Sequence, residues 1–194
     1  VRELYFEVSR SGRDWSEDRK LAGIREPGHS RGGHYQTSAH TSDSTGSKVG
    51  TFFNRHPDGN VDRRTDLYYL QSTDFGNTWT TVTGQALSLP VQEVNSPARV
   101  IDYASLQQNV YLKDMGFDTE GNPVLLYVTS QGHQPGPPND PRWFRVVRWD
   151  GGQWVDSKIC PADHNYDMGS LYLGASDWTV VIPSSPGPQA YHGG

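Results

Sequence analysis

The sequence has little of three features that sort proteins quickly: cysteine, charge of one sign and long apolar runs. Cys160 is the only cysteine among 194 residues, so it cannot form a disulfide within one chain, and cysteine usage indicates no cellular compartment. The formal net charge of −5 argues against nucleic acid as the main partner. No apolar run reaches the roughly 18–20 residues of a membrane-spanning helix, so we expect no membrane partner.

The sequence also lacks the pattern of amphipathic helices, because no stretch repeats its apolar residues with a helical period. Turn-forming and aromatic residues are abundant instead. The 21 glycines, 13 prolines and 11% aromatic residues are typical of many short strands joined by tight turns. We therefore predict an all-β fold.

One motif is sharply defined. Residues 72–79 read S-T-D-F-G-N-T-W, which matches the pattern S-x-D-x-G-x-T-W at each defined position and resembles the Asp box of sialidase-like β-propellers. We expect the Asp74 carboxylate to accept backbone N–H bonds in a tight turn, and Gly76 to adopt a positive φ without strain. Trp79 would then fold over the hairpin and bury its ring. The motif predicts a structural role for its defined positions: Ser72, Asp74, Gly76, Thr78 and Trp79.

The turn of this motif recurs along the chain. A glycine stands three residues before Trp15, Trp79 and Trp154, and a strand-like segment precedes each turn. Around the central copy we expect strands over residues 66–71 and 80–82. A second kind of turn, which leads into a β-rich segment, occurs at residues 45–53, 120–128 and 175–182. A repeated unit of four short strands predicts a β-propeller built of four-stranded antiparallel blades.

The repeats also predict where the blades begin and end. Residues 1–20 supply the end of one blade, 33–83 and 108–159 supply two full blades, and 163–194 supply the first half of another. About three blades are therefore present, whereas a closed propeller needs roughly four to eight. We interpret residues 1–194 as a single segment of a larger propeller, whose remaining blades come from a parent chain or from a second copy.

Function is expected at one end of these blades. The loops between the second and third strands, and those between blades, are long and rich in His, Arg, Tyr and Pro. Because function tends to lie on loops held by a rigid scaffold, we expect the site at this end, opposite the Asp box. His34, Asn109 and His164 each precede the next turn by twelve residues, so we expect them to hold equivalent places near the ring axis.

Several segments resemble the BNR-repeat family, which includes secreted proteins and carbohydrate-active propellers. They are K-V-G-T-F-F-N-R-H-P at 48–57, V-D-R-R-T-D-L-Y-Y-L at 61–70, D-H-N-Y-D-M-G-S-L-Y at 163–172 and P-S-S-P-G-P at 183–188. Within this group the chain is similar to lyases that cleave uronate-containing polysaccharides such as ulvan, and to rhamnose–glucuronate-cleaving enzymes. The resemblance implies an extracellular or periplasmic protein that acts on an acidic polysaccharide by β-elimination.

That chemistry needs a cation or donors to neutralise the uronate carboxylate, and a Tyr or His to take the C5 proton. The resemblance implies four residues that move protons: His56, His133, His164 and Tyr166. It implies four that bind the substrate, the arginines by holding the carboxylate: His34, Arg55, Arg64 and Arg142. Two key histidines of such lyases come from an early blade that looks N-terminal to this chain, which would leave only the Tyr/Arg half of the site here. No spacing is diagnostic of a metal site, and we expect no cofactor.

Three alternatives stay open. The first is structural: Arg64 in a charge cluster with Asp58, Asp62 or Asp66, His133 as a turn cap, and His164 and Tyr166 as satisfied polar groups beside an inner strand. The second is a sialidase-like glycoside hydrolase, which would use three arginines, a Tyr nucleophile backed by Glu and an Asp acid, although no F/Y-R-I-P motif occurs. The third is a non-catalytic glycan-binding propeller with aromatic platforms.

Overall fold

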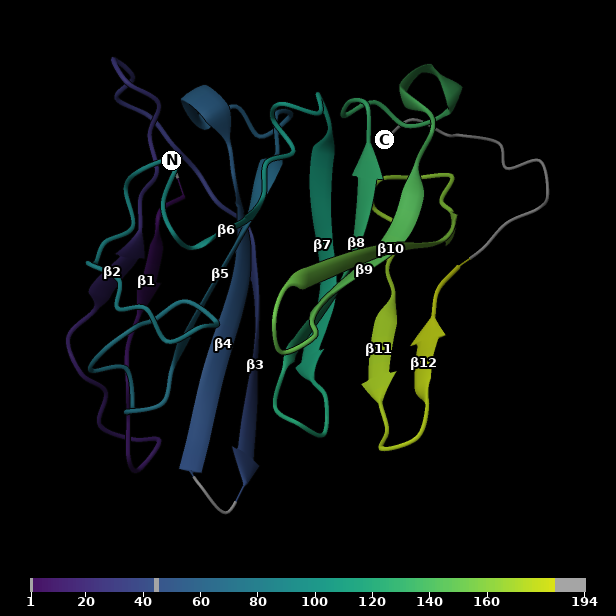
Figure 1. The fold of residues 1–194 in the computed structure, drawn as a ribbon. Helices are drawn as coiled ribbons and strands as arrows, with labels where there is room; N and C mark the ends of the chain where they lie inside the picture. Colours follow the sequence, from purple (N-terminus) through teal and green to yellow (C-terminus); the bar gives the residue numbers. More distant parts are fainter. Residues whose placement is uncertain (1, 44–45, 184–194) are drawn as a thin grey trace.

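A computed structural model of the chain describes residues 2–43 and 46–183, and almost all of its regular structure is β-strand (Figure 1). Four antiparallel sheets stand side by side in chain order. Two of them have four strands each, and a two-stranded hairpin flanks them on either side. No helix in the described ranges is long and apolar enough to cross a membrane. The predictions of an all-β fold and of four-stranded antiparallel blades are confirmed.

The strands follow one another as regular meanders. The first hairpin pairs β1 (Leu4–Phe6) with β2 (Arg19–Ala22). The first four-stranded sheet contains β3 (Gln36–Asp43), β4 (Gly46–Arg55), β5 (Thr65–Ser72) and β6 (Arg99–Ile101), in that order. The second contains β7 (Asn109–Phe117), β8 (Pro123–Ser130), β9 (Trp143–Trp149) and β10 (Trp154–Pro161). The last hairpin pairs β11 (Ser170–Leu173) with β12 (Trp178–Val181), and two 3-10 turns, η1 (Pro57–Gly59) and η2 (Pro137–Asn139), follow β4 and β8.

The fourth strand of the first sheet is not where we expected it. We predicted a strand over residues 80–82, but Thr80 forms only isolated bridges, with Gln71 and with Ala86, and β6 is the strand that pairs with β5. The reason is a turn directly after Thr80. The carbonyl of Thr81 accepts the N–H of Gly84, so the chain reverses before a strand can extend.

The other predicted units agree better with the observed sheets. The predicted blade 108–159 contains β7, β8, β9 and most of β10. The predicted half-blade 163–194 contains β11 and β12, while its end, 184–194, lies outside the described residues, as do most of the segment 183–188 and Thr45. That these sheets belong to a larger ring stays a prediction.

The Asp box forms the turn that its sequence predicts. The Asp74 carboxylate accepts the Thr78 N–H at 2.9 Å and the Thr78 hydroxyl at 2.6 Å, and these bonds lower the pKa of Asp74 to about 2. The Ser72 hydroxyl donates to the same carboxylate and accepts the N–H of Gly76, which has a φ of 74°. Trp79 is buried. The predicted structural role of the box is consistent with each of these contacts.

The core lies between neighbouring sheets. β5 and β8 are buried along their whole length because another sheet covers each of their faces. Trp79 packs edge-on against Phe6 with ring centroids 5.2 Å apart, which fastens the first hairpin to the Asp box. Phe52, Tyr69 and Trp154 form a second aromatic group with centroids 4.7–5.7 Å apart, which joins the two four-stranded sheets. The aromatic residues thus hold successive sheets together.

The two ends of the sheets differ in what they carry. β3, β7 and β11 begin at the end where η1 and η2 lie (upper end in Figure 1). The hairpin turns after β7 and β11 lie at the opposite end. Loops from different sheets meet at the upper end, where Asn109 donates to the carbonyl of Asp62 at 2.7 Å. The sequence-predicted candidates are therefore brought to one end of the molecule.

Candidate functional site

Three tyrosines from three successive sheets surround one arginine at the loop-bearing end. The guanidinium carbon of Arg64 lies 4.7 Å from the ring centroid of Tyr35, 4.9 Å from that of Tyr111 and 5.2 Å from that of Tyr166. Tyr35 directly precedes β3, Tyr111 lies on β7, and Tyr166 lies in the loop before β11. We call these four residues the tyrosine cluster. It exists because the repeat brings the same region of each blade to one place.

The guanidinium of Arg64 is oriented but has donors left over. Its Nε donates to the carbonyl of Val61 at 2.7 Å, and one terminal nitrogen donates to the Tyr166 hydroxyl at 2.9 Å. Among residues 2–43 and 46–183, no carboxylate forms an ion pair with Arg64. The three rings stabilise the cation by cation–π contact without neutralising it. A half-buried guanidinium of this kind is suited to a planar, bidentate anion such as a carboxylate.

Two polar groups of β7 extend the tyrosine cluster. The Lys113 ammonium lies 5.9 Å from the Tyr111 ring centroid and donates to the carbonyl of Asn165 at 2.7 Å; burial lowers its pKa to about 8. The Asn109 side chain donates to the Tyr111 hydroxyl at 3.2 Å. Burial is also the main cause that raises the pKa of Tyr111. A second positive charge and fixed hydrogen-bonding groups therefore lie beside Arg64.

His164 and Tyr166 are placed together at the edge of the tyrosine cluster. Their ring centroids are 5.5 Å apart, and the Tyr166 N–H donates to the His164 Nδ1 at 3.0 Å. Tyr166 is 53% exposed. These two residues, both expected in the site, contact each other at the edge of the tyrosine cluster.

The two buried histidines have different surroundings. His34 donates from Nδ1 to the Asn54 carbonyl at 2.8 Å and accepts the Ile24 N–H at Nε2 at 3.1 Å, so both of its ring nitrogens have partners within the protein. His56 packs edge-on against Tyr35 with centroids 4.7 Å apart, and its Nε2 has no hydrogen-bond partner among the described residues. Burial lowers the pKa of His34 to about 4 and that of His56 to about 3. Both rings are neutral near pH 7, and only His56 retains a free nitrogen.

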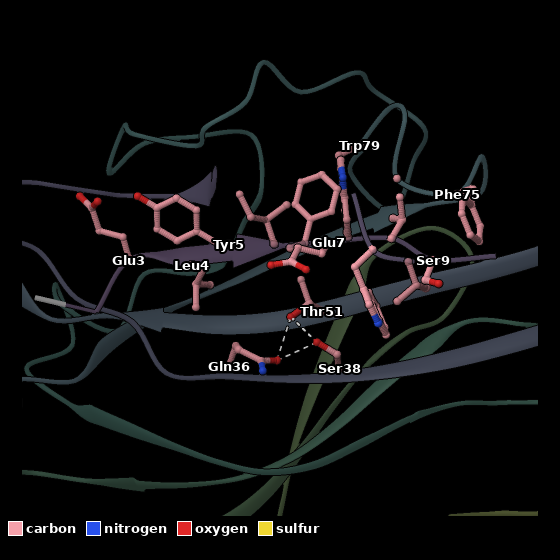
Figure 2. A pocket seen from close by; sticks show the side chains of 16 residues that line it. Glu3, Leu4, Tyr5, Glu7, Ser9, Gln36, Ser38, Thr51, Phe75 and Trp79 are labelled. Atoms are coloured by element: carbon pink, nitrogen blue, oxygen red, sulfur yellow. Dashed lines mark hydrogen bonds between the residues drawn. The ribbon is translucent and has the colours of Figure 1, made fainter. Parts of the chain in front are cut away.

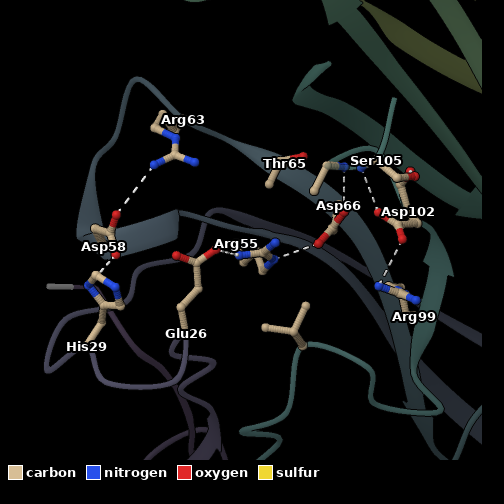
Figure 3. Close-up of polar contacts among 12 residues, drawn as sticks. Glu26, His29, Arg55, Asp58, Arg63, Thr65, Asp66, Arg99, Asp102 and Ser105 are labelled. Atoms are coloured by element: carbon tan, nitrogen blue, oxygen red, sulfur yellow. Dashed lines mark hydrogen bonds and ion pairs between the residues drawn. The ribbon is translucent and has the colours of Figure 1, made fainter. Parts of the chain in front are cut away.

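Arg55 and Arg142 have partners that occupy their guanidinium groups. Arg55 donates to Asp66 at 2.6 Å and to Glu26 at 3.0 Å (Figure 3). Arg142 is fully enclosed, and its nitrogens reach the Asn165 side chain at 2.6 Å and carbonyls of its own loop. This geometry does not support the expected role of these arginines in holding a substrate carboxylate. Long-range ion pairs and loop carbonyls, which the sequence does not reveal, have already satisfied them.

His133 lies apart from the tyrosine cluster, on the wall of a neighbouring hollow. This hollow has a volume of about 380 Å³, and Arg55, Asp62, Asn109 and His133 are among its lining residues. The His133 Nε2 lies 3.9 Å from the Asp62 carboxylate, and both side chains are about half exposed. The sequence-predicted site is therefore divided: Arg64, His164, Tyr166 and the buried His56 surround or adjoin the tyrosine cluster, while His133 faces the adjoining hollow.

One further group has ligand atoms close enough together for a cation. Glu26, His29 and Asp58 each offer one such atom within 4.8 Å of the others (Figure 3). These atoms already have partners, because Glu26 pairs with Arg55 and His29 lies 2.5 Å from Asp58. These contacts occupy the group, and we assign no metal to it.

Sequence reasoning missed Tyr35, Tyr111 and Lys113. We expected the positions of His34, Asn109 and His164 to be equivalent, but Asn109 begins β7, whereas His34 lies two residues before β3 and His164 lies six residues before β11. The rings that meet belong to the tyrosines one or two residues later. A tyrosine one or two residues after each of these positions was the available signal, and the sequence does not show which side chain of each pair faces its counterparts.

The chain belongs to the BNR repeat-containing family, which its sequence matches over residues 4–161. An ulvan lyase of Alteromonas sp. (strain LOR) is 23% identical over 126 residues, which are 65% of this chain and 24% of that protein. The chain thus spans about a quarter of that relative.

Solved structures of polysaccharide lyases have the same fold. An ulvan lyase of family PL25 superposes with a TM-score of 0.66 at 17% identity over 88% of this chain and 41% of that one. The same kind of structure bound to -[GlcA(1-4)Rha3S]- gives 0.66 at 18% identity and the same coverage. The polysaccharide lyase Uly1 gives 0.65 at 15% identity over 98% of this chain and 46% of that one. The predicted propeller fold and the predicted resemblance to ulvan lyases are confirmed, and the chain spans less than half of each structure.

Proposed function

We propose that this BNR repeat-containing chain binds an acidic, uronate-containing polysaccharide at the tyrosine cluster and forms part of a lyase that cleaves it by β-elimination. The observation that carries the proposal is Arg64, a cation oriented by three tyrosine rings and not paired with a carboxylate of the described chain. The uronate carboxylate would accept two N–H bonds from Arg64. Tyrosine rings offer apolar faces for the pyranose rings on either side.

The groups around Arg64 match the steps of an elimination. Neutralising the carboxylate stabilises the charge that develops when the C5 proton leaves. The Tyr166 oxygen, which accepts a bond from Arg64, would take that proton in its deprotonated form. The electron pair of the C5–H bond then forms the C4=C5 double bond, the C4–O bond breaks, and a proton goes to the departing oxygen. Tyr166 or His164 would return that proton.

The proposed substrate indicates a location for the protein. Uronate polysaccharides lie outside cells, so we propose an extracellular or periplasmic location. The bound -[GlcA(1-4)Rha3S]- unit of one solved relative supports an acidic oligosaccharide as partner. A sialidase-like hydrolase receives less support, because that chemistry uses three arginines around one carboxylate, and Arg55 and Arg142 already have internal partners.

Binding without cleavage is the second candidate. It is favoured by the share of the solved lyases that this chain spans, 41–46%, since catalytic groups on other blades would then be needed for turnover. In that case the tyrosine cluster would recognise the polysaccharide, and the product of elimination would form only in a complete ring.

The proposal is tested in two parts. Calorimetry with ulvan oligosaccharides should show binding that Arg64→Gln weakens by tenfold or more, while the matched control Arg63→Gln, which removes the neighbouring exposed arginine, leaves it unchanged. The ultraviolet absorbance of unsaturated uronate then reports elimination in a full-length parent protein. Tyr166→Phe should abolish that signal, and Tyr172→Phe, at an exposed tyrosine on β11, should not. Equal binding by the Arg64 and Arg63 variants would contradict the site.

A further inference from the structure

Two hollows of the molecule differ in what lines them. One, with a volume of about 560 Å³, is lined mainly by apolar and aromatic residues, Phe6 and Trp79 among them (Figure 2). It continues the hydrophobic core of that region, and we assign no ligand to it. The other, of about 380 Å³, is the hollow that contains His133, where loops of the two four-stranded sheets meet. We call it the amide hollow, because four residues with carboxamide side chains line it: Gln107, Gln108, Asn109 and Gln131.

The amide hollow lies next to the tyrosine cluster, and one short segment separates them. Arg63 and Thr65 line the hollow, whereas Arg64 between them contacts the three tyrosine rings. Asn109 also joins the two, since it lines the hollow and its side chain donates to the Tyr111 hydroxyl at 3.2 Å. A saccharide whose uronate lies at Arg64 can therefore place its neighbouring unit in the amide hollow.

The amide hollow and the tyrosine cluster differ in charge. The lining of the hollow includes two arginines and two carboxylates: Arg55, Arg63, Glu26 and Asp62. Each arginine also has a carboxylate partner outside the lining. Arg55 donates to Asp66 at 2.6 Å (Figure 3), and a terminal nitrogen of Arg63 lies 3.4 Å from the Asp58 carboxylate. Carboxylates therefore outnumber arginines around the hollow, whereas the tyrosine cluster is built around a cation.

Such a lining suits an uncharged sugar. Carboxamide groups offer donors and acceptors, and carboxylates accept from hydroxyls, so together they match a hydroxyl-rich ring. Asp62, whose side chain is half exposed, would repel a sulfate or a second carboxylate at this place. The volume of about 380 Å³ lies at the small end of the range of ligand pockets, roughly 300–1,000 Å³, which is room for a short saccharide unit.

We propose that the amide hollow is a second sugar subsite, which takes the uncharged unit next to the uronate held by Arg64. This inference rests on the proposed function and specifies its substrate class: a polysaccharide in which uronate is linked to an uncharged, hydroxyl-rich sugar. A polymer made of uronate alone would place a second carboxylate beside Asp62 and Glu26. A sulfate ester on the neighbouring sugar would meet the same two carboxylates, so both kinds of polymer bind more weakly.

Calorimetry with three probes of equal length tests the subsite: desulfated ulvan oligosaccharides, the sulfated originals and oligogalacturonates. The buffer has a pH of about 7.5, where most histidine is neutral, and about 150 mM salt, which screens distant charges. The desulfated probe should bind about tenfold more tightly than either of the others. Asp62→Asn should reduce this preference to about twofold or less, because it removes the repelling charge. Asp14→Asn, at an exposed carboxylate in the turn between β1 and β2, is the matched control and should leave the preference unchanged.

Arg64→Gln separates failure of the subsite from failure of the proposed function. It should weaken the binding of all three probes, because each of them carries a uronate. If it does so while the three probes bind equally well, or while the preference survives in Asp62→Asn, the subsite is overturned and the proposed function stands. If Arg64→Gln leaves every affinity unchanged, the proposed function fails and the subsite fails with it. Near-ultraviolet circular dichroism confirms that each variant is folded.

Discussion

Arg64 and Arg142 lie in comparable loops at the same end of the molecule, yet their surroundings differ completely. Arg142 is fully buried, and its donors reach an amide side chain, a carboxylate and loop carbonyls. Arg64 is half buried against three tyrosines and has no carboxylate partner in the described ranges. The comparison teaches that, of two loop arginines in equivalent places, only the one without a carboxylate partner is available to bind an anion.

The largest difference between the two arginines is expected in stability, when each is replaced with alanine. Arg142→Ala leaves the Asn165 side chain and two carbonyls without donors, so we expect the free energy of unfolding to fall by about 3–5 kcal/mol. Arg64→Ala loses mainly cation–π contact and should cost about 1 kcal/mol or less. Urea unfolding monitored by tryptophan fluorescence measures both. Equal losses at the two sites would remove the distinction.

A conservative change at Arg64 sharpens the comparison on the binding side. Arg64→Lys keeps the charge but loses the planar fork, so we expect polysaccharide affinity to fall about tenfold with the free energy of unfolding unchanged. Arg63→Lys, at the exposed neighbour that pairs with Asp58, is the matched control. Affinity that is retained in Arg64→Lys would mean that charge alone is recognised.

The two buried histidines give a third, smaller effect that depends on pH. The pKa values of His34 and His56 are lowered to about 4 and about 3 from 6.5. Below pH 6.5 the unfolded chain therefore binds protons that the folded chain excludes. Stability is complete above that pH and falls as the pH drops toward 4, by up to about 1.4 kcal/mol per pH unit for each imidazole.

His56→Gln separates the two contributions. It should flatten this pH dependence by about half, whereas His133→Gln, at the exposed loop histidine, should leave it unchanged. Urea titrations at a series of pH values between 7 and 4 measure the slope. A slope unaltered in His56→Gln would mean that the folded state accommodates the charged ring, and that this ring is open to solvent.

The smallest effect is expected at the opposite end of the blades. The pKa of Asp74 is lowered to about 2 from 3.8, so its contribution to stability is present above pH 3.8 and is lost as the pH falls toward 2. Asp74→Asn should remove that dependence on acid. The affinity for polysaccharide should equal that of the wild type, because the Asp box lies away from the tyrosine cluster. A loss of binding in Asp74→Asn would show that the two ends are coupled.

Much of the fold was predictable because its signals are local. The Asp box needs only a short carboxylate, a hydroxyl and a glycine within eight residues, and these contacts form as expected. The recurrence of such turns predicted the order of the strands. The strand predicted over residues 80–82 was wrong because a second turn, held by the Thr81 carbonyl and Gly84, follows at once. The strand propensity of a segment does not reveal that a turn prevents it from pairing.

The site was predictable only in part, for a different reason. The end of the blades and several residues, Arg64, His164 and Tyr166 among them, were expected there. The sequence did not predict which of these arginines would lack a carboxylate partner. The side chains that contact them come from distant parts of the chain: Tyr166 is 102 residues from Arg64, and Asn165 is 23 residues from Arg142.

Turn chemistry and strand periodicity are properties of neighbouring residues, so the amino-acid sequence alone specified an all-β chain of four-stranded units with its long loops at one end. The charge state and accessibility of a side chain depend on what packs around it. Folding therefore settled that Arg64 faces tyrosines from three sheets, that Arg55 and Arg142 are neutralised, and that the amide hollow lies beside the tyrosine cluster. Each of these outcomes depends on contacts between segments that are far apart in the sequence, so the sequence alone does not show these contacts.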